Sequence, residues 1–179
     1  VRWACRMQSG LIGHLEDHNG RMDGWCDEPW IVHLFGNEKD EKKDFKQGAL
    51  SFYPTWFEKI DFEVINPHSR AKRAGTQPIY YEVVPPKTNG LLRLLYAPHP
   101  GAAMRDKVDP SKALCNLLDV TETLLVSYGI SAKRTAGWGT AKIEVWKAFK
   151  RDQSPIEKSS LPDFKDAVQS WVPSEVKAL

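Results

Sequence analysis

The chain has 179 residues, a length that allows one domain with a substantial core, and its 41% hydrophobic and 27% charged residues are ordinary for a globular protein. A net charge of only +2 excludes a histone-like polycation, so any contact with nucleic acid must come from local basic patches. Three cysteines without a CxxC pair argue against a disulfide framework, and the sequence has no apolar run near the roughly 20 residues of a membrane span and no signal-peptide pattern, so we expect a cytoplasmic protein.

Residues 1–9 are expected to form a short helix, with Trp3 and Met7 facing inward and Arg2 and Arg6 on another face. The chain opens in the middle of this amphipathic pattern, which leads us to expect that a preceding segment lies elsewhere. Residues 10–30 contain four glycines and are expected to be an irregular loop.

The middle of the chain is expected to consist mainly of strands. After the apolar residues 31–36, a run of four acids and four bases at 38–46 is expected to be a solvated insertion. Residues 48–54 and 61–65 are expected to pair as strands, and so are 78–84 and 91–97, which flank a Pro-Pro-Lys-Thr-Asn-Gly turn. This arrangement makes residues 66–77 a basic loop that projects between strands.

A long helix is predicted to begin at Asp109 and Pro110, which are suited to the N-cap and the first helical position. Apolar positions then recur at helical spacing up to Gly129, where a helix end is expected; they are Leu114, Leu117, Leu118, Thr121, Leu125 and Tyr128. Residues 141–149 alternate like a strand. The order of elements predicts an α+β domain over residues 1–150, consistent with a ferredoxin-like sheet, and a tail with a short helix over 151–179.

The segment after this helix is framed by Gly129 and Gly139, which permit positive φ angles and a close approach of the backbone to a ligand. It is basic and contains no acid, and its bases are Lys133, Arg134 and Lys142. Exposed N–H groups in such a turn can bind an anion, and Trp138 offers a face for stacking. The loop therefore suits a phosphodiester backbone, although a helix end followed by a tight turn also explains its glycines. It matches neither a phosphate-binding P-loop nor a dinucleotide fingerprint.

The helix, glycine loop and strand resemble the end of the domain in the RAMP superfamily of CRISPR-associated proteins. The family loop reads Gly-hydrophobic-Gly, five residues, Gly-hydrophobic-Gly; residues 129–131 and 137–139 match it, with Ser131 in place of one glycine. Residues 34–36 with 48–54, and residues 64–86, are similar to two further blocks of type III backbone subunits. The resemblance implies a ferredoxin-like (RRM-like) fold with an inserted β-hairpin, the thumb, that lies across a guide RNA.

The first helix resembles the one that follows a Pro-Gly-Ser-Ser-Leu-Lys-Gly-x-x-Arg segment in this family. The resemblance thus implies that the first strand and that loop lie upstream of Val1, and that the domain is incomplete at its N-terminus. In target-cleaving members the catalytic Asp belongs to this upstream part, so no residue of the chain is assigned to catalysis and target cleavage stays open.

The function implied is that of a backbone or cap subunit of a type III CRISPR effector ribonucleoprotein in antiviral defence. Its expected partners are guide RNA, target RNA and other effector subunits, with no membrane and no cofactor. The expected RNA contacts lie in the glycine loop, in the thumb loop and on the first helix: Lys133, Arg134, Thr135, Gly137, Trp138 and Gly139; His68, Arg70, Lys72 and Arg73; Arg2 and Arg6.

Three alternatives remain at this point. A structural zinc ion could use a cluster of early residues, Cys5, His14, His18 and Cys26 with His33, although the cysteines lack the usual ligand spacing. A repeat-processing endoribonuclease of the same superfamily would use a histidine as general acid or base, and His14 or His18 would be the candidates. The chain could also be a scaffold subunit that does not grip RNA.

Overall fold

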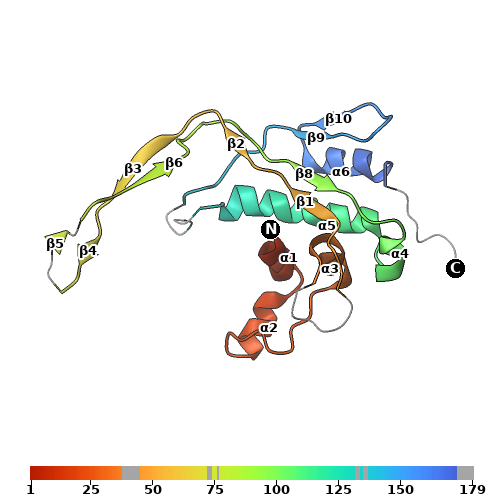
Figure 1. Cartoon of the computed structure of the whole chain (residues 1–179), viewed down its shortest axis with the longest axis horizontal. Coiled ribbons are helices and arrows are strands. Elements are labelled where there is room, and N and C mark those ends of the chain that lie inside the picture. The colour runs from red at the N-terminus through yellow and green to blue at the C-terminus, as the bar shows by residue number, and fades with distance from the viewer. Residues whose placement is uncertain (38–44, 72–73, 76, 132–133, 135–136, 173–179) are drawn as a thin grey trace. The chain divides into compact units, whose positions relative to one another are not determined.

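The computed structural model describes residues 1–37, 45–71, 74–75, 77–131, 134 and 137–172 (Figure 1). The chain divides into two compact units. We call Val1–Leu50 with Tyr96–Leu179 the helical unit and Ser51–Leu95 the ribbon unit. The combination of helices with small antiparallel sheets is α+β, as predicted. In the described part of the chain, no helix is both long and apolar enough to cross a membrane.

The helical unit holds all the described helices. They are α1 (Arg2–Gln8), α2 (Leu11–Asp17), α3 (Pro29–Phe35), α4 (Ala102–Asp106), α5 (Pro110–Thr123), which continues into the π-helical turn η1 (Leu124–Tyr128), and α6 (Leu161–Gln169). The irregular loop predicted for residues 10–30 is wrong in part, because α2 lies within it and buries Leu11 completely.

Helix α1 forms where it was predicted, but it buries a different face. Trp3 is 56% exposed, whereas Cys5 is fully buried in a core cluster with Ile31 of α3 and Val120 of α5. The prediction that Trp3 and Met7 face inward is therefore wrong. A helix of seven residues has too few positions for its apolar pattern to define one face.

Helix α5 begins as predicted, because the Asp109 side chain accepts hydrogen bonds from the N–H groups of Ser111 and Lys112. Its buried face contains Ala113 and Leu117 together with Val120 of the core cluster. Helix α5 therefore crosses the centre of the unit and carries the glycine loop at its C-terminal end.

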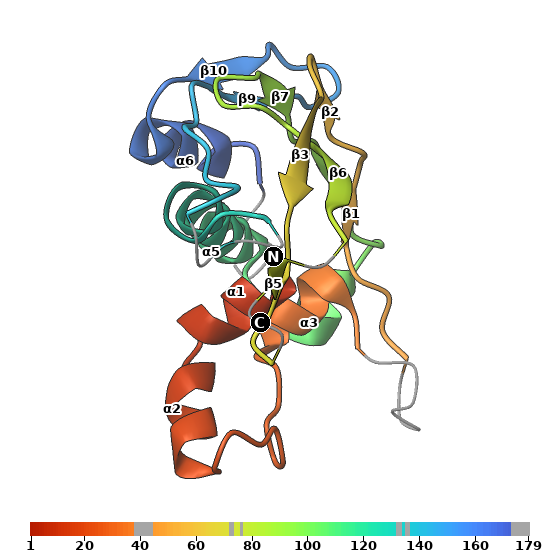
Figure 2. The ribbon, with the colours of Figure 1, turned by 90° about the vertical axis from the view of Figure 1, so that its left-hand side faces the viewer.

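The C-terminal segment predicted as a tail belongs to the helical unit. Strand β9 (Trp146–Ala148) pairs antiparallel with β10 (Ile156–Lys158), and α6 lies between this hairpin and α5 (Figure 2). Trp146 stacks on Phe164 of α6, with 5.7 Å between the ring centroids, and Lys165 of α6 pairs with Asp119 of α5 at 2.8 Å. The boundary expected at residue 150 therefore does not divide the structure.

The ribbon unit is built from nested antiparallel strand pairs. Its strands are β2 (Trp56–Phe57), β3 (Asp61–Ile65), β4 (His68–Ser69), β5 (Ala74–Gly75), β6 (Ile79–Val83) and β7 (Gly90–Leu91), and the chain enters and leaves it through β1 (Leu50–Phe52) and β8 (Leu94–Tyr96). The pairs are β1–β8, β2–β7, β3–β6 and β4–β5.

This nesting corrects the predicted pairing. Strand β3 pairs with β6 rather than with β1, and β8 pairs with β1 rather than with β6. The Pro-Lys turn is present, since the N–H of Thr88 donates to the carbonyl oxygen of Pro85, but the strands on its two sides have different partners. Strands β4 and β5, which lie within the loop predicted at 66–77, are at the end of the ribbon (Figure 1), and residues 72, 73 and 76 of that loop lie outside the described residues.

Candidate nucleic-acid interface

The glycine loop of the helical unit is closed at its base by backbone contacts. The N–H of Ile130 donates to the carbonyl oxygen of Gly139 over 2.9 Å. A Cβ atom at Gly139 would lie 2.6 Å from the carbonyl oxygen of Ile130, and one at Gly129 would lie 2.8 Å from that of Trp138. Both glycines have positive φ, 73° at Gly129 and 83° at Gly139. The close approach of the two ends therefore leaves no room for a side chain at either glycine.

Both ends of this loop are also anchored to the π-helical turn η1. The N–H of Gly129 donates to the carbonyl oxygen of Leu124 over 2.7 Å, and the N–H of Ala141 donates to that of Leu125 over 2.8 Å. Turns of this kind occur frequently at functional sites. Backbone hydrogen bonds therefore hold both ends of the loop to the last turn that follows α5.

The side chains of the loop are placed at its surface. Arg134 is exposed and Trp138 is half-buried, and the carbonyl oxygen of Arg134 accepts a hydrogen bond from the N–H of Gly137. Lys142 pairs with Glu144 at 2.9 Å, but both side chains are largely exposed, so this pair leaves the lysine accessible. Lys133 and Thr135 lie outside the described residues.

The second predicted basic cluster lies at the tip of the ribbon unit. His68 of β4 pairs with Gly75 of β5 in the backbone register, and Arg70 follows β4 with an exposed side chain. Lys72 and Arg73 lie outside the described residues. The tip and the glycine loop belong to different units, so each is a separate candidate contact.

Arg2 and Arg6, predicted to bind RNA, both contact one buried carboxylate. Asp27 accepts hydrogen bonds from Arg2 and Arg6 at 2.6 Å and from the indole N–H of Trp25 at 3.1 Å. Burial raises the pKa of Asp27, but these hydrogen bonds outweigh burial and lower the pKa from 3.8 to about 2. A phosphate would have to compete with this carboxylate for both guanidinium groups.

The early cysteines and histidines do not gather into one site. Cys5 is buried, and burial raises the pKa of its thiol to about 11, whereas Cys26 is exposed. The rings of His14 and His18 stack on each other with 4.1 Å between centroids, and His14 also meets the edge of Trp25. Among the residues that the structure describes, no three His, Cys, Asp or Glu side chains are placed to hold a metal ion.

A buried polar network was missed by sequence analysis. His33 of α3, only 2% exposed, lies 3.3 Å from the carboxylate of Asp106 through Nδ1 and 2.9 Å from the hydroxyl of Tyr96 through Nε2. Burial raises the pKa of Asp106, but hydrogen bonds from Arg105, Lys46 and His33 lower it to about 2. His33 therefore has an ionised carboxylate beside one ring nitrogen and a hydroxyl beside the other. Partners 63 and 73 residues away leave no local sequence signal.

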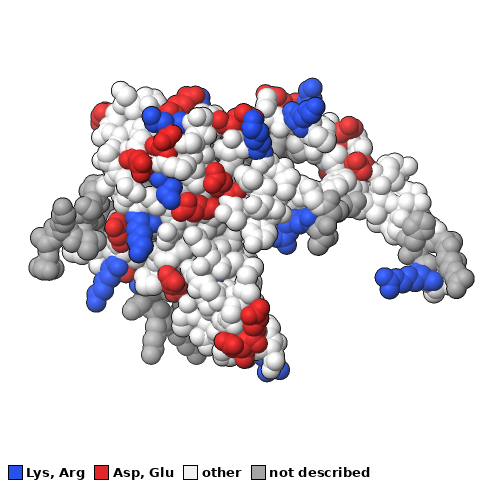
Figure 3. All heavy atoms as spheres, turned by 180° about the vertical axis from the view of Figure 1, so that it is seen from behind, with Lys and Arg blue, Asp and Glu red and all other residues white. Residues whose placement is uncertain are grey.

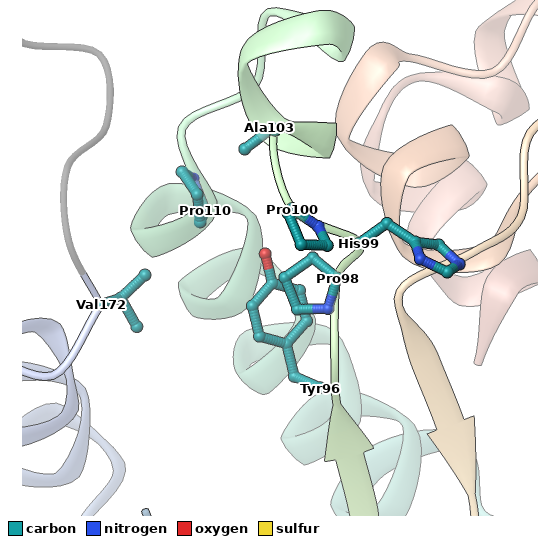
Figure 4. Close-up of a pocket in the computed structure, with 8 residues that line it drawn as sticks. Tyr96, Pro98, His99, Pro100, Ala103, Pro110 and Val172 are labelled. Carbon is teal, nitrogen blue, oxygen red and sulfur yellow. The ribbon is translucent and has the colours of Figure 1, made fainter.

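Tyr96 also lines a cavity of about 170 Å³ in the helical unit (Figure 4). Its other walls are mainly apolar and come from Pro98, His99, Pro100, Gly101, Ala103, Pro110 and Val172. None of these eight residues is a lysine, an arginine or an acid, so the cavity provides no charged group to bind a phosphate. The glycine loop and the ribbon tip are therefore the better candidates for a polyanion.

No family model matches the chain, and no curated protein matches it.

Proposed function

We propose that this chain binds RNA as a backbone or cap subunit of a type III CRISPR effector ribonucleoprotein. The observation that carries the proposal is the closed glycine loop at the end of α5. Its two ends meet at Gly129 and Gly139, and it carries the exposed Arg134 and the half-buried Trp138. A cation and an aromatic ring on a loop that backbone hydrogen bonds close at its base suit a phosphodiester backbone.

The ribbon tip supports the same function. Residues 66–78 contain three bases and no acid in the sequence, and β4 and β5 within this stretch pair at the end of the ribbon (Figure 1). A thumb that lies across a guide RNA needs this combination of length and positive charge. The ferredoxin-like fold of the RAMP superfamily is part of the proposal, as are guide RNA, target RNA and other effector subunits as partners.

In this proposal the protein positions RNA and base pairing reads its sequence, because phosphate contacts carry no sequence information. The proposal rests on the loop and the tip. Arg2 and Arg6 are not needed for it, since Asp27 already holds both guanidinium groups. It assigns no catalytic residue.

The proposal is tested by reversing one charge in the loop. Arg134→Glu is compared with Arg151→Glu, an equally exposed arginine in the β9–β10 turn of the same unit. The affinity for single-stranded RNA is measured by fluorescence anisotropy at several salt concentrations. Arg134→Glu should weaken binding by about three- to tenfold and reduce the salt slope by about 0.7 or more, because one phosphate contact is lost. Arg151→Glu should change neither by as much.

If Arg134→Glu leaves both the affinity and the salt slope at the values of the unmodified protein, the loop does not hold RNA. A scaffold subunit that does not grip RNA would give this result.

A further inference from the structure

The stem of the ribbon unit, strands β3 and β6, has no core of its own. None of the residues in 51–95 whose side-chain exposure the structure describes is buried, and large apolar side chains remain exposed, among them Phe62 at 65% and Tyr80 at 72%. A two-stranded hairpin of this kind is at best marginally stable alone in water, because it buries too little apolar surface. A stable ribbon therefore requires another surface to cover its apolar side chains.

The register of β3 with β6 shows which face is uncovered. Phe62 lies opposite Glu82, and Val64 lies opposite Tyr80, so these four side chains share one face. All four are exposed, whereas on the other face Ile65, Tyr81 and Val83 are half-buried. We call the exposed set of Phe62, Val64, Tyr80 and Glu82 the stem face.

The charge of the stem differs from that of the tip. The paired segments 61–65 and 79–83 contain three acids, Asp61, Glu63 and Glu82, and no base. The tip at 66–78 contains three bases and no acid. In Figure 3, acidic side chains lie on the projecting part of the ribbon, and one basic side chain is visible at its far end. Carboxylates repel a phosphodiester backbone, so the stem favours a partner other than RNA.

The size of the stem face limits the partner further. Five residues per strand span about 17 Å, and two strands with their side chains are about as wide as one helix. A helix of roughly 11 residues covers this length at 1.5 Å per residue. Its contact side must be apolar, to cover Phe62, Val64 and Tyr80, and it must carry a basic residue at its border, to meet Glu82, the acid on this face. Asp61 and Glu63 lie on the opposite face and add only a longer-range negative potential.

We propose that the stem face docks an amphipathic helix of a partner protein, with an apolar contact side bordered by lysine or arginine. This surface is separate from the proposed RNA contacts, and the inference does not depend on them. The ribbon then has two chemically distinct parts, a stem that binds protein and a tip that binds a polyanion.

The test uses the full chain and two fluorescent synthetic peptides of about 18 residues, long enough to be helical. One peptide has leucine on one side and lysine on the other, and its matched control has glutamate in place of lysine. The lysine peptide should bind at least about tenfold more tightly than the glutamate peptide. Phe62→Ser with Tyr80→Ser should weaken it by about tenfold or more, whereas Phe149→Ser, which changes an equally exposed ring of the helical unit, should have little effect.

Glu82→Lys is a second variant that keeps the apolar side chains. It should lower the affinity for the lysine peptide and raise the affinity for the glutamate peptide. This result tests the proposal even if the double serine variant does not fold. Equal binding of the two peptides, or no effect of Glu82→Lys, would overturn the proposal. Two further results would overturn it by assigning the stem face to another occupant: a lower affinity for single-stranded RNA in the double variant, or loss of a concentration-dependent dimer in sedimentation.

Discussion

The N–H of Ile130 donates to the carbonyl oxygen of Gly139 over 2.9 Å, and the two chain ends of the glycine loop are thereby held together. The distance is possible because neither Gly129 nor Gly139 carries a side chain. The glycines are therefore required by the closure of the loop, whatever the loop binds.

Replacement of a glycine at the closure should open the loop. In Gly139→Ala the new Cβ would lie 2.6 Å from the carbonyl oxygen of Ile130, whereas in Gly137→Ala it would meet nothing within 4 Å. Both positions have positive φ, so each variant should lose about 1 kcal/mol to backbone strain. The clash should add about 1–2 kcal/mol in Gly139→Ala alone. The rate of hydrogen exchange at the Ile130 amide reports how often the loop opens, and it should rise more in Gly139→Ala than in Gly137→Ala. An equal rise in both variants would contradict the prediction.

Removal of the Asp27 carboxylate should destabilise the helical unit. Its side chain is 6% exposed and contacts both Arg2 and Arg6, so Asp27→Ala removes a carboxylate that two partly buried cations share. We expect a loss of about 2–4 kcal/mol in the free energy of unfolding, measured by urea denaturation. Glu144→Ala is the control, because Glu144 and its partner Lys142 are largely exposed, and it should cost less than about 0.5 kcal/mol. Similar losses of unfolding free energy in the two variants would show that the contacts of Asp27 with Arg2 and Arg6 do not stabilise the helical unit more than an exposed ion pair does.

The protein should lose stability in acid between about pH 4 and pH 2. Asp27 and Asp106 have pKa values lowered from 3.8 to about 2 in the folded chain. A lowered folded pKa adds stability above the unfolded value, and this stability is lost as the pH falls through the folded value. Each group should contribute on the order of 1–2 kcal/mol, after allowance for solvent around Arg2 and Arg105. Urea denaturation at several pH values measures the free energy of unfolding. In the double variant with Asp27→Ala and Asp106→Asn, this free energy should depend less on pH between pH 4 and pH 2.

Loss of the Tyr96 hydroxyl should remove the hydrogen-bond partner that the structure places at Nε2 of His33. His33 is almost fully buried, so Tyr96→Phe should cost about 1–2 kcal/mol of unfolding free energy. Tyr80→Phe, at a tyrosine that is 72% exposed, should cost less than about 0.5 kcal/mol. Thermal denaturation compares the two variants. If they melt at the same temperature, the hydroxyl does not stabilise the buried histidine.

Elements with local signals could be predicted from the sequence. Helix α5 was predicted because Asp109 and Pro110 mark its start and its apolar residues recur over four turns. Helix α6 was predicted from a short amphipathic pattern, and Ser160 caps it by accepting from the N–H of Asp163. Both signals depend only on residues that are close in the chain, which is why they could be recognised.

Strand partners and buried polar contacts could not be predicted in the same way. The runs that form β3 and β6 were recognised as strands, but a turn signal after Val83 favoured the wrong partner. The contacts of His33 with Asp106 and of Arg2 with Asp27 join residues that are 73 and 25 positions apart. Partners at such distances are selected by packing of the whole unit, so no spacing rule identifies them.

Nested pairing also determines how this ribbon can change length. Deleting one opposed pair, such as Ile65 and Ile79, would shorten it by about 3.4 Å and turn the tip over relative to the stem, because side chains alternate between faces. Deleting two successive pairs would shorten it by about 7 Å and restore the original facing. If the side chains of the tip are to keep the same facing, the length of the ribbon can therefore change only by two residues per strand at a time.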